Sequence, residues 1–169
     1  MKALFITPKD LKRKSIISGD TDNDKLLQFV EVAQDTHIQN YLGTNLYVKL
    51  QELVVNDDIN TPAYDDYKNL LIEYIKPMLI WYSQVAYLPF APYNIGNGGL
   101  FKHRSSNDDT ITQEELTKLI YKASETAEFY TSRFVDYMRY NSTLYPEYNT
   151  SSNEQMRPDR DVNFTGWAL

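Results

Sequence analysis

The sequence predicts an all-α protein, a helical bundle of about four helices, and two observations lead to this fold class. Apolar residues recur at three- and four-residue steps over most of the first 145 positions, which is the period of an amphipathic helix. Helix-start signals, namely a capping side chain followed by proline or by glutamate, precede several of these segments. Two helices are expected to be long, and an irregular loop or small β-hairpin and a C-terminal arm complete the chain.

The first two helices follow from signals near the N-terminus. Thr7-Pro8 is a capping residue followed by proline at the first helical position, so a short helix is expected over about 8–14. From Asp22 to Tyr41 the apolar residues keep the helical spacing without a break, which predicts a longer helix there.

The middle of the chain continues this pattern. Gly43 is expected to end the second helix at a position with positive φ, and Thr44 to cap the next helix. Thr61-Pro62 repeats the cap-plus-proline signal and opens a long helix that reaches about Leu88.

Pro77 lies inside that long helix. There it removes one backbone hydrogen bond and clashes with the carbonyl of Glu73, at a cost of ~3 kcal/mol. Because the apolar pattern resumes beyond the proline, we expect a kink rather than a stop. The middle of this helix is apolar almost all round, so it should be covered on more than one side.

The segment that follows is rich in Pro, Gly, Asn and Ser and is too long for a simple turn. Two short strands, NIG and GLFKH, are expected to flank Asn97-Gly98, a pair typical of hairpin turns. The alternative is an irregular loop.

The last long helix begins at the T-x-x-E capping box of Thr112 and Glu115 and is expected to end before Pro146. The remainder is polar and has no periodicity, so we expect a helical domain over 1–145 and an extended arm over 146–169. The arm ends in apolar residues, which suggests that it docks onto a partner: Phe164, Trp167 and Leu169.

An acidic stretch has the register of an EF-hand calcium loop, with oxygen-bearing side chains at Asp20, Asp22, Asp24 and Glu31. Lys25 occupies the sixth position, where such a loop needs glycine, and the helical pattern has begun by the next residue. We therefore interpret the stretch as a helix start, with Thr21 or Asp22 as the cap and Asp24 in the first turn. No metal site is expected.

Composition excludes several functions. The net charge of −6 does not favour bulk binding to nucleic acid, and the absence of cysteine excludes thiolate chemistry and disulfides. Neither a signal peptide nor a membrane span is expected. With two histidines, His37 and His103, and no catalytic or phosphate-binding motif, we expect neither an enzyme nor a cofactor. The 14 tyrosines fit half-buried helix faces or an extensive interface.

The block DNDKLLQFVEVAQDTHIQNYLGTNLYVKL resembles the opening of tailed-phage head–tail connector (adaptor) proteins, in which an acidic cap leads an amphipathic helix to a tyrosine-leucine-glycine turn. The later order is also similar: a long helix, a Gly/Asn loop, a last helix with AEFYTSRFVDYMRYN, and an arm. The resemblance covers roughly residues 10–145. It is closest to connector or ring proteins of phages that infect Bacteroides-type hosts, including the crAss-like group.

The resemblance implies a structural virion protein in the phage neck, made in the host cytoplasm. Copies would form a ring, twelve in most relatives, between the portal protein and the next tail or ring protein. The ring would extend the DNA channel and support DNA retention and ejection, and an acidic wall would let DNA pass without specific binding.

The family's docking arm corresponds here to 157–169, and its subunit or channel loop to 93–107. The implied arm contacts are Arg157, Arg160, Phe164, Trp167 and Leu169; those of the loop are Tyr93, Asn97, Phe101, Lys102, His103 and Arg104. The alternative function is a small helical adaptor or regulator that acts through protein–protein contacts on its tyrosine-rich faces.

Overall fold

The fold is all-α, as the sequence predicts, and the computed structural model describes residues 2–17, 19–96, 99–102, 111–150 and 155–161. The main helices are α1 (Pro8–Lys14), α2 (Asn23–Ala33), α3 (Gln39–Val55), α4 (Asp65–Leu70), α5 (Lys76–Tyr87), α6 (Gln113–Asn141) and α7 (Pro146–Asn149). Short 3-10 turns cover Asp58–Asn60, Pro62–Tyr64, Leu88–Phe90 and Ser142–Leu144.

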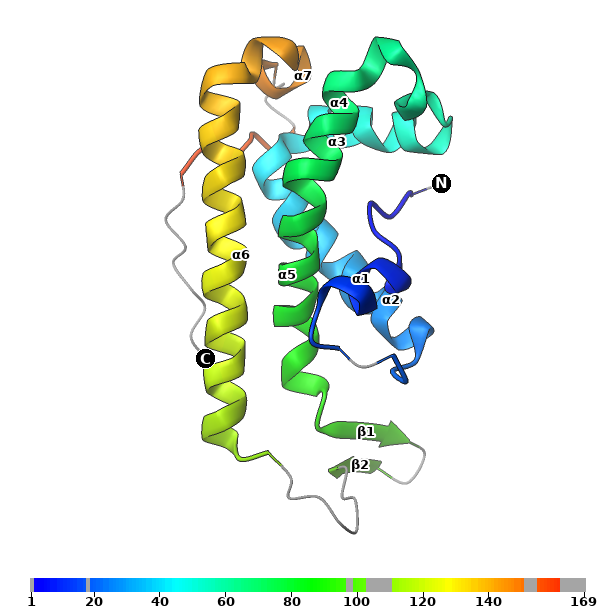
Figure 1. Ribbon diagram of the computed structural model, residues 1–169, viewed down its shortest axis with the longest axis vertical. Helices are drawn as coiled ribbons and strands as arrows, with labels where there is room; N and C mark the ends of the chain where they lie inside the picture. The colour runs from blue at the N-terminus through cyan, green and yellow to red at the C-terminus, as the bar shows by residue number, and fades with distance from the viewer. Residues whose placement is uncertain (1, 18, 97–98, 103–110, 151–154, 162–169) are drawn as a thin grey trace.

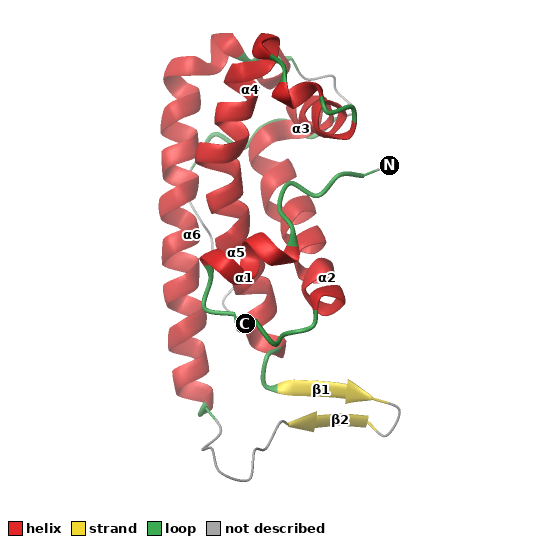
Figure 2. Cartoon of the chain, turned by 45° about the vertical axis from the view of Figure 1, so that its right-hand side comes forward, coloured by secondary structure: helices red, strands yellow, loops and turns green. Residues whose placement is uncertain are grey.

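The helices are arranged around α5. Helix α6 packs along one side of α5, and α1 and α2 pack on the other, as Figures 1 and 2 show from two directions. Helix α5 is apolar almost all round and packs against helices on both sides. Its buried residues include Met78, Leu79, Ile80 and Tyr82. The expectation of a helix covered on more than one side is confirmed.

Three of the predicted helix starts are confirmed in detail, whereas Thr61 makes no side-chain capping bond: a 3-10 turn, Pro62–Tyr64, follows it and α4 begins only at Asp65. Thr7 and Thr112 each form a complete capping box, with Asp10 and Glu115 respectively, at the starts of α1 and α6. Asp22 caps α2, because its side chain accepts a hydrogen bond from the backbone of Asp24. These caps satisfy backbone N–H groups that have no partner within the helix.

A π-helical turn, Leu71–Ile75, precedes Pro77 and joins α4 to α5. The N–H of Lys76 bonds to the carbonyl of Leu71, five residues back, so the ladder opens by one residue where the proline removes a donor. The helix continues beyond the proline, as expected. A second π-helical turn, Gln34–Ile38, joins α2 to α3.

The chain bends inside α3 at Gly43, where φ is 71° and ψ is 163°. This backbone conformation is essentially restricted to glycine, so the predicted positive φ is confirmed. Thr44, expected to cap the next helix, uses its hydroxyl to accept a hydrogen bond from the Met156 N–H.

Two strands, β1 (Tyr93–Gly96) and β2 (Gly99–Lys102), form an antiparallel hairpin at one end of the bundle (Figure 1). Gly96 pairs with Gly99, so Asn97-Gly98 connects the strands as the sequence predicts, although these two residues lie outside the described part. The Lys25 ammonium bonds to the carbonyl of Tyr93 and ties the hairpin to α2.

The predicted arm differs from the structure at its start. Residues Pro146–Asn149 form helix α7, and the side chains of Tyr145 and Tyr148 are 0% and 3% exposed within the main hydrophobic core. The sequence does not predict this packing, because the stretch is polar apart from the two tyrosines, whose rings supply the buried apolar area. An arm that begins at residue 146 is therefore wrong, and these residues belong to the helical body.

No helix among the described residues is long and apolar enough to cross a membrane.

Candidate functional site

The described residues of the predicted arm lie against the body of the protein. Residues 155–161, which we call the C-terminal clasp, follow the bend in α3. The Thr44 N–H donates to the Met156 carbonyl (3.0 Å), and the Asp159 N–H donates to the Asn40 carbonyl (2.9 Å). The ring of Pro158 lies over Gly43, where a Cβ would come within 2.7 Å of Pro158 Cδ. Glycine is required there for space as well as for conformation.

Arg160, one of the residues implied to dock a partner, is engaged within the chain. Its guanidinium donates to the carbonyl of Tyr148 (3.4 Å) and to Asn149 Oδ1 (3.3 Å), and lies 5.1 Å from the centre of the Tyr148 ring. Arg160 therefore fastens the clasp to α7. Arg157, the other implied residue in the clasp, is exposed, as Arg160 is.

The remaining implied contacts are only partly visible. Tyr93, Phe101 and Lys102 lie in the hairpin strands. The others lie outside the described residues: Asn97, His103, Arg104, Phe164, Trp167 and Leu169.

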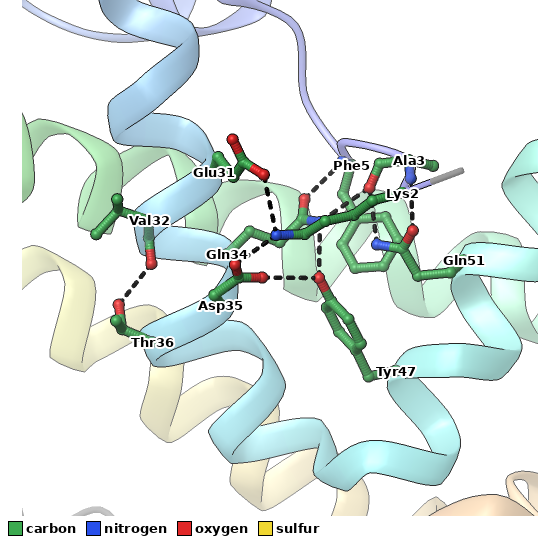
Figure 3. Close-up of polar contacts among 10 residues, drawn as sticks. All are labelled: Lys2, Ala3, Phe5, Glu31, Val32, Gln34, Asp35, Thr36, Tyr47 and Gln51. Atoms are coloured by element: carbon green, nitrogen blue, oxygen red, sulfur yellow. Dashed lines mark hydrogen bonds and ion pairs between the residues drawn. The ribbon is translucent and has the colours of Figure 1, made fainter.

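A polar cluster at the C-terminal end of α2 holds the N-terminal strap, by which we mean residues 2–6 (Figure 3). Gln34, fully buried in the π-helical turn, accepts from the Phe5 N–H (2.8 Å) and donates to the Ala3 carbonyl (2.9 Å). Gln51 of α3 accepts from the Ala3 N–H and donates to the same carbonyl. The two glutamine side chains thus hydrogen-bond backbone N–H and C=O groups of the strap, as the backbone of a neighbouring strand would.

The cluster is completed by charged and aromatic groups. The ammonium of Lys2 pairs with Glu31 and Asp35, and the hydroxyl of Tyr47 donates to Asp35. Burial disfavours the charge on Lys2, but its hydrogen bonds to Asp35 and Glu31 outweigh burial and raise the pKa. The Phe5 ring is buried and packs edge-on against Tyr47. The strap is therefore an integral part of the fold.

His37 stacks on Tyr82 with ring centres 3.9 Å apart and planes 6° from parallel. Burial lowers the pKa of His37 to about 4, so the imidazole is neutral at pH 7. The hydroxyl of Tyr82 shares a hydrogen bond with Thr131 of α6 (3.0 Å). The stack ties the π-helical turn to α5, so His37 has a structural role in the fold.

A tyrosine cluster joins α4, α6 and α7 at the end opposite the hairpin. Tyr145 donates to the Asp66 carbonyl (3.0 Å) and shares a hydrogen bond with Tyr137 (2.9 Å), while Tyr67 donates to Glu147 (2.7 Å). Burial raises the pKa values of Tyr67 and Tyr145. These tyrosines are structural groups with satisfied hydroxyls.

Two shallow pockets flank the C-terminal part of α6. The smaller, about 200 Å³, lies beside the clasp and is lined by Val135, Met138, Arg139, Ser142, Tyr148 and Arg160. The other, about 390 Å³, is lined by Tyr74, Arg133, Asp136, Tyr137, Tyr140 and Asn141. No group of three or more His, Cys, Asp or Glu residues in the described ranges is placed to hold a metal ion.

The most conspicuous candidate surface is the outward face of α6, which sequence analysis missed. Tyr121, Phe129 and Tyr140 are 61%, 59% and 87% exposed, although aromatic side chains favour burial. The sequence contains a signal for this surface, because all three aromatic residues fall on the side of the helix opposite its apolar stripe. Large exposed aromatic residues on one helix face indicate an interaction surface.

Comparison with known proteins gives one match. A model described as "Family of unknown function (DUF6712)" matches residues 38–157, from the end of the first π-helical turn into the clasp. No curated protein and no solved structure matches the chain.

Proposed function

The chain belongs to the DUF6712 family, whose function is unknown, and from that premise we propose that it is a structural subunit of a tailed-phage virion. In this proposal copies of the chain form a head–tail connector ring between the portal protein and the next tail component. The resemblance of residues 22–50 to connector proteins motivates the proposal. One structural observation carries it: exposed apolar side chains on two opposite sides of the bundle.

The two sides belong to different helices. On one side lies the outward face of α6 with its exposed aromatic residues. Helix α2 lies on the other side of α5 (Figure 1). Two of its residues, Leu27 and Val32, are 43% and 47% exposed. A subunit in a head-to-tail ring contacts its two neighbours through two different surfaces, so it needs an adhesive face on each side. The arrangement around α5 supplies both.

The proposed role follows from this geometry. A ring of such subunits would surround the DNA path, and the net charge of −6 would let the duplex slide because few phosphate charges are neutralised. The C-terminal residues beyond the clasp, with Phe164, Trp167 and Leu169, would dock onto the portal, since an apolar tail gains affinity by burying aromatic groups.

Electron microscopy of the protein mixed with the portal protein of the same phage tests the proposal. We expect rings, twelve-fold if the family pattern holds, stacked on the portal. A mixture in which the portal retains no protein at micromolar concentrations overturns the connector role. Small discrete oligomers that ignore the portal would instead favour the helical adaptor, which uses the same exposed faces for another partner.

A further inference from the structure

The outward face of α6 carries a stripe of seven exposed residues whose spacing is symmetric. Successive members are four, three, four, four, three and four residues apart, so the spacing is the same from either end, with Phe129 at the centre. All seven lie within one sector of the helix, opposite the buried Ala127, Phe134 and Met138. The stripe comprises Lys118, Lys122, Glu125, Phe129, Arg133, Asp136 and Tyr140.

The chemistry of the stripe is complementary to itself. When two copies of a helix pack antiparallel about a two-fold axis, each residue meets the one equally far on the other side of the axis. With the axis at Phe129, Lys122 meets Asp136 and Glu125 meets Arg133, both of opposite charge. Lys118 meets the ring of Tyr140, a cation–π pair, and Phe129 meets itself.

We propose that the free protein forms a two-fold symmetric dimer in which the α6 stripes of two copies pack antiparallel. The partner for this surface is therefore a second copy of the chain. Tyr140 lies 22 residues after Lys118, so the two helices would be in contact over about 33 Å, at about 1.5 Å per residue. The Phe129 contact at the centre would be flanked by four ion pairs, two from each half of the symmetric interface, and a Lys118–Tyr140 cation–π pair would lie at each end.

The charges also fix the register. A shift of three residues would bring Lys122 to Arg139 and Glu125 to Asp136, which places like charges together and is unfavourable. Within one chain, Lys122 pairs with Glu125 (2.6 Å) and Asp136 with Arg139 (3.1 Å), and all four side chains are exposed. Exposed pairs of this kind contribute little, so they can exchange for partners in a second copy.

This inference concerns the protein in isolation and does not rest on the connector function. In a ring the α6 stripe would face a different surface of the neighbour, so the dimer and the ring would exclude each other. The dimer would then cover an adhesive face until assembly begins.

A single cysteine at the proposed axis tests the geometry, because the chain has no cysteine of its own. In Phe129→Cys the two thiols would lie next to each other, and oxidation by diamide should give a disulfide-linked dimer in high yield. Val48→Cys, on an exposed position of α3, is the matched control and should remain monomeric on a non-reducing gel. Equal crosslinking of both variants, or of neither, overturns the proposal.

Charge exchange tests the register by sedimentation equilibrium. Lys122→Glu and Asp136→Lys should each weaken dimerisation about tenfold or more, and the double variant should restore it because each new charge meets its opposite. Lys9→Glu, an equal charge change on exposed α1, is the control and should have no effect. Wild-type protein that is monomeric at all accessible concentrations, or a double variant weaker than both single variants, contradicts the dimer. Failure of the portal to bind would leave this result unaffected.

Discussion

Gly43 combines two constraints that no other residue satisfies. Its φ of 71° with ψ of 163° is a glycine-only conformation, and a Cβ would lie 2.7 Å from Pro158 Cδ. We predict that Gly43→Ala lowers the free energy of unfolding by about 2–4 kcal/mol, measured by urea denaturation.

Gly19→Ala is the matched control, because a Cβ there has no atom within 4 Å, and it should change stability by less than about 0.5 kcal/mol. A shorter chain that ends at Thr150 separates the cost of the backbone conformation at residue 43 from the cost of the clash with Pro158. Without Pro158 the steric part disappears, so Gly43→Ala should be less destabilising there. An equal penalty in both chains would rule out the contact with the clasp as a cause.

His37 should make stability depend on pH. The unfolded imidazole takes up a proton near pH 6.5, whereas burial lowers the pKa in the folded protein to about 4. The unfolded state therefore binds more protons between these values, and folding becomes less favourable as the pH falls from about 6.5 towards 4. The loss is complete below pH 4 and amounts to roughly 3 kcal/mol at most.

The comparison with His37→Phe isolates this effect from the carboxylates that titrate in the same range. Phenylalanine keeps an aromatic ring on Tyr82 but cannot take up a proton. Between pH 7.5 and 4.5, wild type should lose more stability than the variant. Parallel pH profiles for the two proteins would show that His37 is not the titrating group.

At the scale of elements, sequence predicts the helices well where local signals act. The capping boxes at Thr7 and Thr112 and the Asp22 cap involve residues at most three apart. Both partners of each hydrogen bond are therefore visible in a short stretch of sequence. The positive φ of Gly43 and the pairing around Asn97-Gly98 are predictable for the same reason.

The π-helical turn Gln34–Ile38 is not predictable in this way, because its side chains contact distant parts of the chain. In Gln34–Ile38, the turn brings Gln34 inward to the strap and His37 onto Tyr82 of α5. Glutamine on a helix usually suggests a solvated position, and nothing near Gln34 in sequence identifies its partner 31 residues away. The same limit applies to Gln51.

The N-terminal strap should depend on these two glutamines unequally. Gln34→Leu leaves the buried Phe5 N–H without an acceptor, so we predict a loss of about 2–3 kcal/mol in the free energy of unfolding. Gln51→Leu acts at a partly buried position where water can substitute, and it should cost about 1 kcal/mol.

Hydrogen exchange at the strap distinguishes this mechanism from general destabilisation. Both glutamines bond the Ala3 carbonyl, so the double variant should cost more than the sum of the single variants. The Phe5 amide should lose protection in Gln34→Leu while amides in the middle of α6 keep theirs. Uniform loss of protection in both segments would argue against a local role for the strap.

For the whole molecule, the sequence predicts an all-α bundle but cannot say which tyrosines are buried. Tyr145 and Tyr148 lie in the core, Tyr67 and Tyr137 join helices through their hydroxyls, and Tyr140 is 87% exposed. Each sits in a similarly polar stretch, so composition does not separate them; packing does. The candidate surface on α6 is visible only once the buried face of that helix is known.

The clasp also changes how the docking tail is best tested. Removal of residues 157–169 would delete clasp contacts together with the proposed anchors, so a folding defect and a docking defect would be confused. A chain that ends at Asp161 keeps the described clasp and removes the segment with Phe164, Trp167 and Leu169. We predict that this chain has a free energy of unfolding within about 0.5 kcal/mol of that of the full-length protein, because it keeps the clasp contacts of Met156, Asp159 and Arg160.

A chain that ends at Thr150 should lose both the stabilising contacts of the clasp and the proposed docking segment. It exposes Tyr148 and removes the backbone hydrogen bonds to Asn40 and Thr44, so we expect a loss of about 2–4 kcal/mol in urea denaturation. Under the connector proposal, both shortened chains should fail to co-sediment with the portal protein, but only the shorter one should be destabilised. Portal binding by the chain that ends at Asp161 would exclude the last eight residues as the docking segment and would turn attention to the outward faces of α2 and α6.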